Sequence, residues 1–271
     1  MPAFDVTDEL HAAVLEAMQT ATDAEVMPRW RSLAEGEVRT KSAEWDVVTD
    51  ADVLAEKRLT LALRTLIDIP VVGEEATAAD PALVDLVADS DACWLVDPVD
   101  GTKNFVEGRE DFACMIALVV GGKTRAAWIT HPAVGRRMWG SRGGGVFIDG
   151  EAVPTPTPSD PDRPRGAVGA RLFIEDADAV YARAQELGPV QDIRFCAGWD
   201  YYDVLVGAKD YVLFSRSLPW DHAPGGLLVA EAGLRIGRFN GDEYLPGDGR
   251  KGLLTAHPTV WERVRDGLGI A

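Results

Sequence analysis

Amphipathic helical patterns and short apolar runs alternate along the first half of the chain. Leu10, Val14 and Met18 recur at helical spacing and predict an opening helix over residues 6–34; a second helix is expected over residues 50–67. Short apolar runs predict buried strands at residues 69–72, 93–96, 112–120 and 124–130. These patterns indicate helices that pack on a largely antiparallel sheet.

Glycine, aspartate and proline mark two turns and one longer connecting segment. Gly121-Gly122 and Asp149-Gly150 each stand between two apolar runs and accept positive φ, so each predicts a β-hairpin. Residues 154–164 hold five prolines and little apolar content, which is typical of a linker or an exposed loop. We therefore expect two lobes, residues 1–153 and 154–271.

The second half has shorter elements. Helical patterns lie at residues 176–187, 199–206, 222–232 and 258–268. Short strand patterns lie between them at residues 190–195, 211–214 and 234–236. This alternation predicts a smaller α/β lobe.

Net charge limits the classes of binding partner, and the cysteines and the N-terminal segment indicate the cellular compartment. Of 271 residues, 27 are Lys or Arg and 44 are Asp or Glu, and a net charge of −17 disfavours nucleic acid and anionic membranes as partners. Three dispersed cysteines indicate neither a disulfide framework nor a zinc cage, and fit a reducing compartment. The acidic start lacks the basic region of a signal peptide, and the run 112–120 is too short to span a bilayer. We expect a cytoplasmic protein.

Acidic residues follow apolar segments at three places. Glu74 comes directly after one predicted strand, and Asp97 and Asp100 after another. Asp221 lies between Trp220 and an apolar helix, where an N-cap role is the alternative. Two like charges 4 Å apart cost about 4 kcal/mol at an effective dielectric constant of 20, so a cluster of these acids requires a cation. Oxygen ligands alone favour Mg²⁺, with Mn²⁺ or Ca²⁺ as alternatives.

The segment from Asp97 to Thr102 combines metal and phosphate chemistry. Pro98 disfavours helix at Asp97, and Gly101 permits a tight turn into a helix that starts near Thr102. Backbone N–H groups at such a helix start bind phosphate. A simple strand–turn–helix with an Asp cap explains one aspartate, but not both of them together with Glu74.

These motifs resemble those of a known family. Residues 97–105, Asp-Pro-Val-Asp-Gly-Thr-Lys-Asn-Phe, resemble the first signature of the inositol monophosphatase family of metal-dependent, lithium-sensitive phosphatases, and residues 220–225 resemble its second. Residues 73–75 and 46–52 resemble two further segments of the family. The likeness implies an α/β (α+β) five-layer α/β/α/β/α sandwich, a homodimer, and hydrolysis of phosphomonoesters with two or three Mg²⁺ ions.

The resemblance also implies metal ligands. Glu74, Asp97 and the carbonyl of Val99 would hold a first ion. Asp97, Asp100 and Asp221 would hold a second, and Glu74 would also face a third.

Catalytic roles follow from the same resemblance. Gly101 and Thr102 would present backbone N–H groups to the phosphate. Asp52 would hydrogen-bond Thr102, whose hydroxyl orients the attacking water, and Glu74 would help to activate that water.

The substrate is expected to be a small phosphorylated metabolite. Inositol-selective members carry a glutamate seven residues before the position of Asp221, and this chain has Phe214 there, so inositol 1-phosphate is not the favoured substrate. Asp200 and Arg216, with Phe214, are candidates for the leaving-group pocket. Pro224 is expected in a first helical turn. Histidinol phosphatase and nucleotide 3′-phosphatase are alternatives; a catalytically silent regulator is disfavoured, because every metal carboxylate is present.

Overall fold

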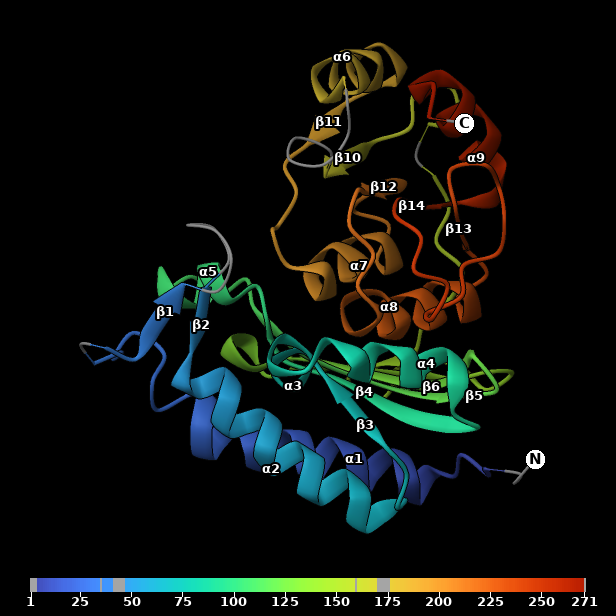
Figure 1. The fold of residues 1–271 in the computed structure, drawn as a ribbon. Coiled ribbons are helices and arrows are strands. Elements are labelled where there is room, and N and C mark those ends of the chain that lie inside the picture. The colour runs from blue at the N-terminus through green and yellow to red at the C-terminus, as the bar shows by residue number, and fades with distance from the viewer. Residues whose placement is uncertain (1–3, 35, 41–46, 159, 170–175, 271) are drawn as a thin grey trace.

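The N-terminal helices form one outer layer. The computed structural model describes residues 4–34, 36–40, 47–158, 160–169 and 176–270. Helix α1 (Asp8–Ala21) continues into a π-helical turn (Thr22–Val26) and packs beside α2 (Asp50–Leu66) (Figure 1). The predicted helix over 6–34 is therefore too long. Pro28 has no N–H to continue the helical ladder, and Arg31 adopts a φ of 60°.

A large sheet lies against these two helices. The described residues form a seven-stranded sheet in the order β3-β4-β5-β6-β7-β8-β9, in which only β3 and β4 run parallel. Its strands are β3 (Val71–Gly73), β4 (Ala92–Asp100), β5 (Ala113–Val120), β6 (Lys123–His131), β7 (Arg136–Ser141), β8 (Gly145–Ile148) and β9 (Glu151–Ala152). Every residue of β4 is buried, because helices cover both faces of the sheet. The largely antiparallel sheet is confirmed.

Short elements connect and flank the strands. Helices α3 (Glu74–Ala79) and α4 (Leu86–Asp89) link β3 to β4, and α5 (Thr102–Val106) follows β4. Strands β1 (Val38–Thr40) and β2 (Val47–Thr49) form an antiparallel pair before α2. Both predicted hairpins are present: Gly121 and Gly122 join β5 to β6, and Asp149 and Gly150 join β8 to β9, each at positive φ.

The second half forms a smaller sheet with helices on both sides. Its order is β11-β10-β12-β14-β13 among the described residues. The strands are β10 (Gly166–Gly169), β11 (Val190–Gln191), β12 (Tyr211–Phe214), β13 (Arg235–Gly237) and β14 (Leu253–Ala256). The helices are α6 (Ala177–Leu187), α7 (Ala197–Leu205), α8 (Pro219–Glu231) and α9 (Pro258–Leu268). Between β9 and β10, the described part of the proline-rich segment forms no helix or strand.

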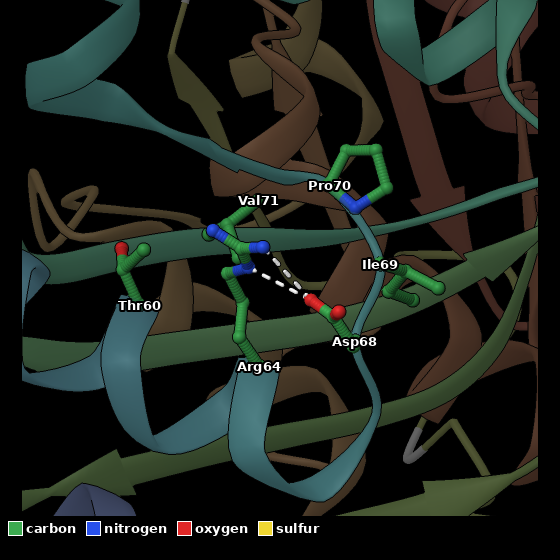
Figure 2. Close-up of a pocket in the computed structure, with 6 residues that line it drawn as sticks. All are labelled: Thr60, Arg64, Asp68, Ile69, Pro70 and Val71. Carbon is green, nitrogen blue, oxygen red and sulfur yellow. Dashed lines mark hydrogen bonds and ion pairs between the residues drawn. The ribbon is translucent and has the colours of Figure 1, made fainter.

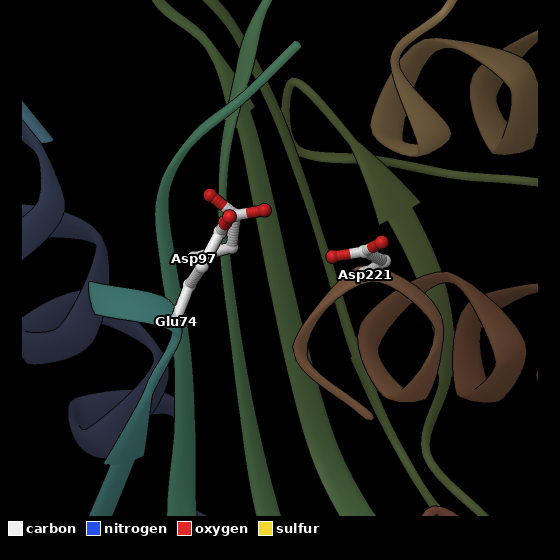
Figure 3. A group of neighbouring side chains, drawn as sticks. All are labelled: Glu74, Asp97 and Asp221. Carbon is white, nitrogen blue, oxygen red and sulfur yellow. The ribbon is translucent and has the colours of Figure 1, made fainter. Parts of the chain in front are cut away.

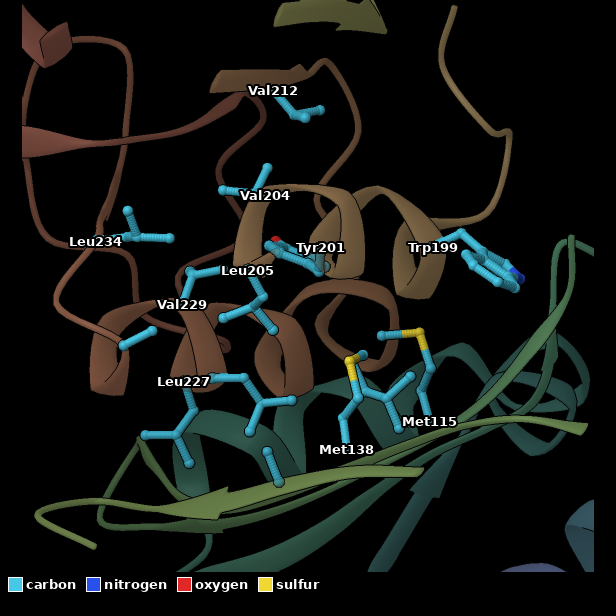
Figure 4. Packing of buried hydrophobic residues seen from close by; sticks show 14 of the residues in the cluster. Met115, Met138, Trp199, Tyr201, Val204, Leu205, Val212, Leu227, Val229 and Leu234 are labelled. Carbon is cyan, nitrogen blue, oxygen red and sulfur yellow. The ribbon is translucent and has the colours of Figure 1, made fainter. Parts of the chain in front are cut away.

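Five layers stack on one another, as the sequence resemblance implies. Helices α1 and α2 are followed by the large sheet, then α7 and α8, then the small sheet, then α6 and α9 (Figure 1). Figure 4 shows the packing between the sheets, where Met115 and Met138 of the large sheet face Leu227 and Leu205 of the middle helices. Truncating such a core leucine to alanine costs about 2–5 kcal/mol. The middle layer is thus firmly fixed to the large sheet. In the described part of the chain, no helix has the length and apolar character to cross a bilayer.

Candidate active site

Carboxylates from three separate elements meet at one edge of the large sheet. Glu74 is the first residue of α3, directly after β3; Asp97 lies in β4; and Asp221 lies in the first turn of α8. Because β3 and β4 are parallel neighbours, Glu74 and Asp97 emerge side by side, and α8 approaches from the middle layer (Figure 3). Each residue offers an oxygen, and these oxygens all lie within 4.8 Å of one another. The predicted convergence is confirmed for these three acids.

Helix α8 begins earlier than the sequence indicates. Its N-cap is Leu218 and its first residue is Pro219, so Asp221 is the third helical residue. The N-cap alternative for Asp221 is therefore wrong. Pro224 is the sixth residue, beyond the first turn, so that expectation is also wrong. Proline there has no N–H to donate to the carbonyl of Trp220, one turn earlier.

A β-bulge shapes the segment around Asp97. In the pairing with β5, Asp97 faces Met115 and Asp100 faces Ala113, so β4 holds one extra residue. Bulges redirect side chains and are common next to active sites. Gly101 then turns the chain with a φ of 82°, and a Cβ at this position would lie 2.9 Å from a backbone carbonyl oxygen. Only glycine fits this turn, which leads into α5 as predicted.

Burial and nearby acids disfavour the ionised forms of Asp97 and Asp100. Asp97 is 2% exposed, and burial raises its pKa well above the ordinary value, with Glu74, Asp100 and Asp221 raising it further. Burial also raises the pKa of Asp100 to about 6, although hydrogen bonds from Cys196 Sγ (3.0 Å) and the Gly198 N–H (2.7 Å) oppose this shift. A divalent cation among these oxygens would relieve the repulsion, and an all-oxygen donor set fits Mg²⁺.

Asp52, a further buried acid, reaches the start of α5. Asp52 lies in the first turn of α2, where its Oδ2 accepts a hydrogen bond from the Thr49 N–H. Thr102 Oγ1 lies 3.1 Å from Asp52 Oδ1 and 3.0 Å from the Val99 carbonyl oxygen, and its single proton has these two acceptors. The hydrogen bond between Asp52 and Thr102 that the resemblance implies is thus present. Asp46, which begins the matching motif, lies outside the described residues.

Three contributors to the site are absent from the sequence-based prediction. Cys196 and Gly198 bind Asp100 from the start of α7, far along the chain. Glu56 is buried on α2 and binds backbone N–H groups of α3. Its spacing, four residues after Asp52 and three before Leu59 in the predicted helix, is the signal in the sequence that places it on the same helix face as these residues.

The candidate pocket residues have different surroundings. Asp200 is buried, and its carboxylate accepts a hydrogen bond from Lys209 Nζ at 2.6 Å, so it has a partner inside the protein. The ring of Phe214 packs against those of Tyr201 and His222, with centroids 5.1 and 4.7 Å away. Arg216 is half-buried in the loop between β12 and α8.

A surface hollow lies elsewhere on the molecule. It has a volume of about 440 Å³ and lies where α2 turns into β3 (Figure 2). Its lining residues are Thr60, Arg64, Asp68, Ile69, Pro70 and Val71. Two of these lining residues, Arg64 and Asp68, form an ion pair (2.8 Å), and none of the acids in the cluster lines the hollow.

Comparisons with known proteins agree with this architecture. The model of the inositol monophosphatase family matches residues 7–266. A Thermotoga maritima fructose-1,6-bisphosphatase/inositol-1-monophosphatase is 27% identical over 212 residues, which cover 76% of this chain and 77% of the relative. The solved structure of a Thermotoga maritima IMPase has a TM-score of 0.82 at 22% identity and covers 97% of each chain. An IMPase/NADP phosphatase complexed with Mg²⁺ and phosphate has a TM-score of 0.80 at 20% identity and covers 96% of this chain and 94% of its own.

Proposed function

Because the chain belongs to the inositol monophosphatase family and is thus a phosphatase that hydrolyses phosphomonoesters, we propose that it works with two or three Mg²⁺ ions held at the acid cluster. The proposed ligands are Glu74, Asp97, the Val99 carbonyl, Asp100 and Asp221. The observation that carries this proposal is the convergence of three carboxylate oxygens within 4.8 Å of one another. The similarity to a phosphatase complexed with Mg²⁺ and phosphate supports the choice of metal.

The residues around the cluster support hydrolysis by water. When bound, the ions supply Lewis-acid chemistry, in that they neutralise phosphate charge and lower the pKa of water. Thr102 gives its hydroxyl proton to Asp52 or to the Val99 carbonyl, so its oxygen accepts a hydrogen bond from the attacking water and orients it. Glu74 accepts a proton from that water. The N–H groups of Gly101 and Thr102, which have no carbonyl partner inside the helix at its first turn, bind the phosphate.

We propose a small phosphorylated metabolite other than inositol 1-phosphate as the substrate. Inositol hydroxyls need a hydrogen-bond acceptor, and the ring of Phe214, packed against Tyr201 and His222, supplies none. Arg216 is close to Asp221 in sequence. It is the candidate residue for binding an anionic or polar leaving group. The homodimer and the cytoplasmic location stay predictions.

Phosphate release from a panel of phosphomonoesters tests the proposal. The panel includes inositol 1-phosphate, histidinol phosphate, a nucleotide 3′-phosphate and sugar phosphates, each assayed with Mg²⁺ and with a chelator. We expect activity only with Mg²⁺, and a loss of about 10³-fold or more in Asp221→Asn, which corresponds to about 4 kcal/mol. Asp68→Asn, in the surface hollow, is the matched control and is expected to keep wild-type activity.

Two outcomes would contradict the proposal. Full activity in the chelator would exclude the metal-dependent mechanism. Inositol 1-phosphate as the best substrate of the panel would overturn the argument from Phe214 but leave the metal site intact.

A further inference from the structure

Glu56 binds the backbone at the start of α3. It lies on α2, one turn after Asp52, and is 5% exposed. Its Oε2 accepts a hydrogen bond from the Glu75 N–H at 2.7 Å, and its Oε1 accepts one from the Ala76 N–H at 2.8 Å. Both N–H groups belong to the first turn of the helix that Glu74 begins. The two oxygens of one buried carboxylate therefore hold the backbone directly after a proposed metal ligand.

Gly73 makes room for this carboxylate. It is the N-cap of α3 and has no side chain with which to bind the first N–H groups. A Cβ at Gly73 would lie 2.7 Å from Glu56 Oε1, and closer still to the carboxylate carbon and Oε2. Glu56 thus fills the space of the missing side chain and caps the helix from another element.

We propose that Glu56 is a positioning residue for Glu74 and hence for metal binding. Charge-assisted hydrogen bonds from backbone N–H groups to a buried carboxylate are short and about twice as strong as neutral ones, so they fix the first turn of α3 firmly. Helix α2 then organises both sides of the site: Asp52 holds Thr102, and Glu56 holds the residues that follow Glu74. The inference rests on the proposed function, because it takes Glu74 as a metal ligand.

The first test measures metal binding directly in the full chain. Glu56→Gln keeps the size of the side chain but replaces one acceptor oxygen by an NH₂ group that faces a backbone N–H. Removing such a supporting contact lowers metal affinity about 10–100-fold. We expect this loss for Mg²⁺ and Mn²⁺ in calorimetric titrations, with the substrate KM at saturating metal close to the wild-type value.

Asp80→Asn is the matched control for the loss of a capping carboxylate. Asp80 follows the last residue of α3, and its Oδ1 accepts a hydrogen bond from the Ala82 N–H at 3.2 Å. Asp80 is exposed, and its contact caps the 3₁₀ helix Pro81–Asp85 that follows α3, at the end of α3 away from Glu74. We expect wild-type metal affinity in Asp80→Asn; an equal loss in both variants would show that the loss does not depend on the contact between Glu56 and α3, and would overturn the positioning role.

A double-mutant cycle tests the same inference without relying on Glu56→Gln. Gly73→Ala places a Cβ where the carboxylate lies, so it should weaken metal binding in the wild-type background. In Glu56→Ala the space is open, and Gly73→Ala should then change metal affinity much less. Residues in contact show such non-additivity, whereas independent residues do not. Equal effects of Gly73→Ala in the two backgrounds would overturn the inference.

Asp97→Asn separates this inference from the proposed function. If Glu56→Gln binds metal like the wild type while Asp97→Asn has lost binding, the positioning role is wrong and the metal site stands. If Asp97→Asn also binds metal normally, the proposed metal site itself is wrong.

Discussion

Two regions of this protein bury several carboxylates, and they differ in how the charge is balanced. Near the middle helices, Asp200 and Asp203 share Lys209, whose Nζ lies 2.6 and 3.0 Å from their oxygens, and all three residues are buried. Burial raises the pKa of Asp200, but Lys209 opposes the shift. At the edge of the large sheet, burial raises the pKa of Asp97 and the neighbouring acids raise it further.

The difference distinguishes a cluster of ion-paired residues from the proposed metal site. Lysine and carboxylates that bind each other inside the protein need nothing from outside. Carboxylates that repel one another in a buried space favour a ligand of opposite charge, and strong pKa perturbation of this kind is typical of active sites. The comparison therefore supports assigning chemistry to Asp97 and structure to Asp200.

The largest effect is expected from a substitution in the proposed metal site. Asp97→Asn removes a proposed ligand to two ions and should lower kcat by about 10³-fold or more. The same change replaces a buried carboxyl group, whose ionisation is opposed by burial and by the neighbouring acids, with a neutral amide, so the metal-free variant should unfold at a higher temperature than the metal-free wild type. Assays of phosphate release and thermal melts in a chelator measure the two effects. A variant that is both inactive and less stable would contradict the account of repulsion.

The second largest effect is expected from a substitution in the ion-paired cluster of Asp200, Asp203 and Lys209. Lys209→Met leaves Asp200 and Asp203 buried without this cation, and removing one partner of a buried ion pair costs about 3–5 kcal/mol. We expect that loss in the free energy of unfolding, measured with urea in a chelator. The metal affinity of the folded protein should match the wild type. A variant of normal stability with weakened metal binding would reverse the assignment of the two regions.

The smallest effect concerns pH. Burial raises the pKa of Asp100 from 3.8 to about 6, so the folded chain binds more protons than the unfolded chain between these values. The contribution of Asp100 to stability is therefore lost as pH rises through this window, by up to about 1.4 kcal/mol per pH unit. Asp100→Asn should thus gain stability relative to metal-free wild type from pH 4 to 6, and the gain should then level off.

Two buried histidines also make the free energy of unfolding depend on pH, so the effect of Asp100 is measured as the difference between variant and wild type. Burial lowers the pKa of His131 and of His222 to about 3, so their contribution to stability is lost as pH falls below 6.5. This trend is opposite in sign and common to both proteins. Subtracting wild-type from variant unfolding free energies at each pH removes it. A difference that does not vary between pH 4 and 6 would contradict the raised pKa of Asp100.

Local signals predicted the elements with long or strongly marked patterns. Helix α2 ends within one residue of its expected limits, and both hairpin turns occur at the expected pairs of residues. Strands β10 and β14 were not predicted; two of the four residues in β10 are glycines, whereas β12, of the same length, was predicted from its unbroken run of apolar and aromatic residues. The opening helix was predicted too long, because the prediction followed the apolar spacing and did not take Pro28 into account.

The amino-acid sequence alone determined what the proposed site has to offer: which acids follow apolar strands, where glycine and proline turn the chain, and an all-oxygen donor set, which favours a hard cation. Only the tertiary structure decided which acids share a space and which have a lysine partner. It also decided that Glu56 caps a helix distant in sequence. Hydrophobic periodicity reports which face of an element is buried, whereas the balance of charge inside the protein depends on contacts between elements that no local pattern encodes.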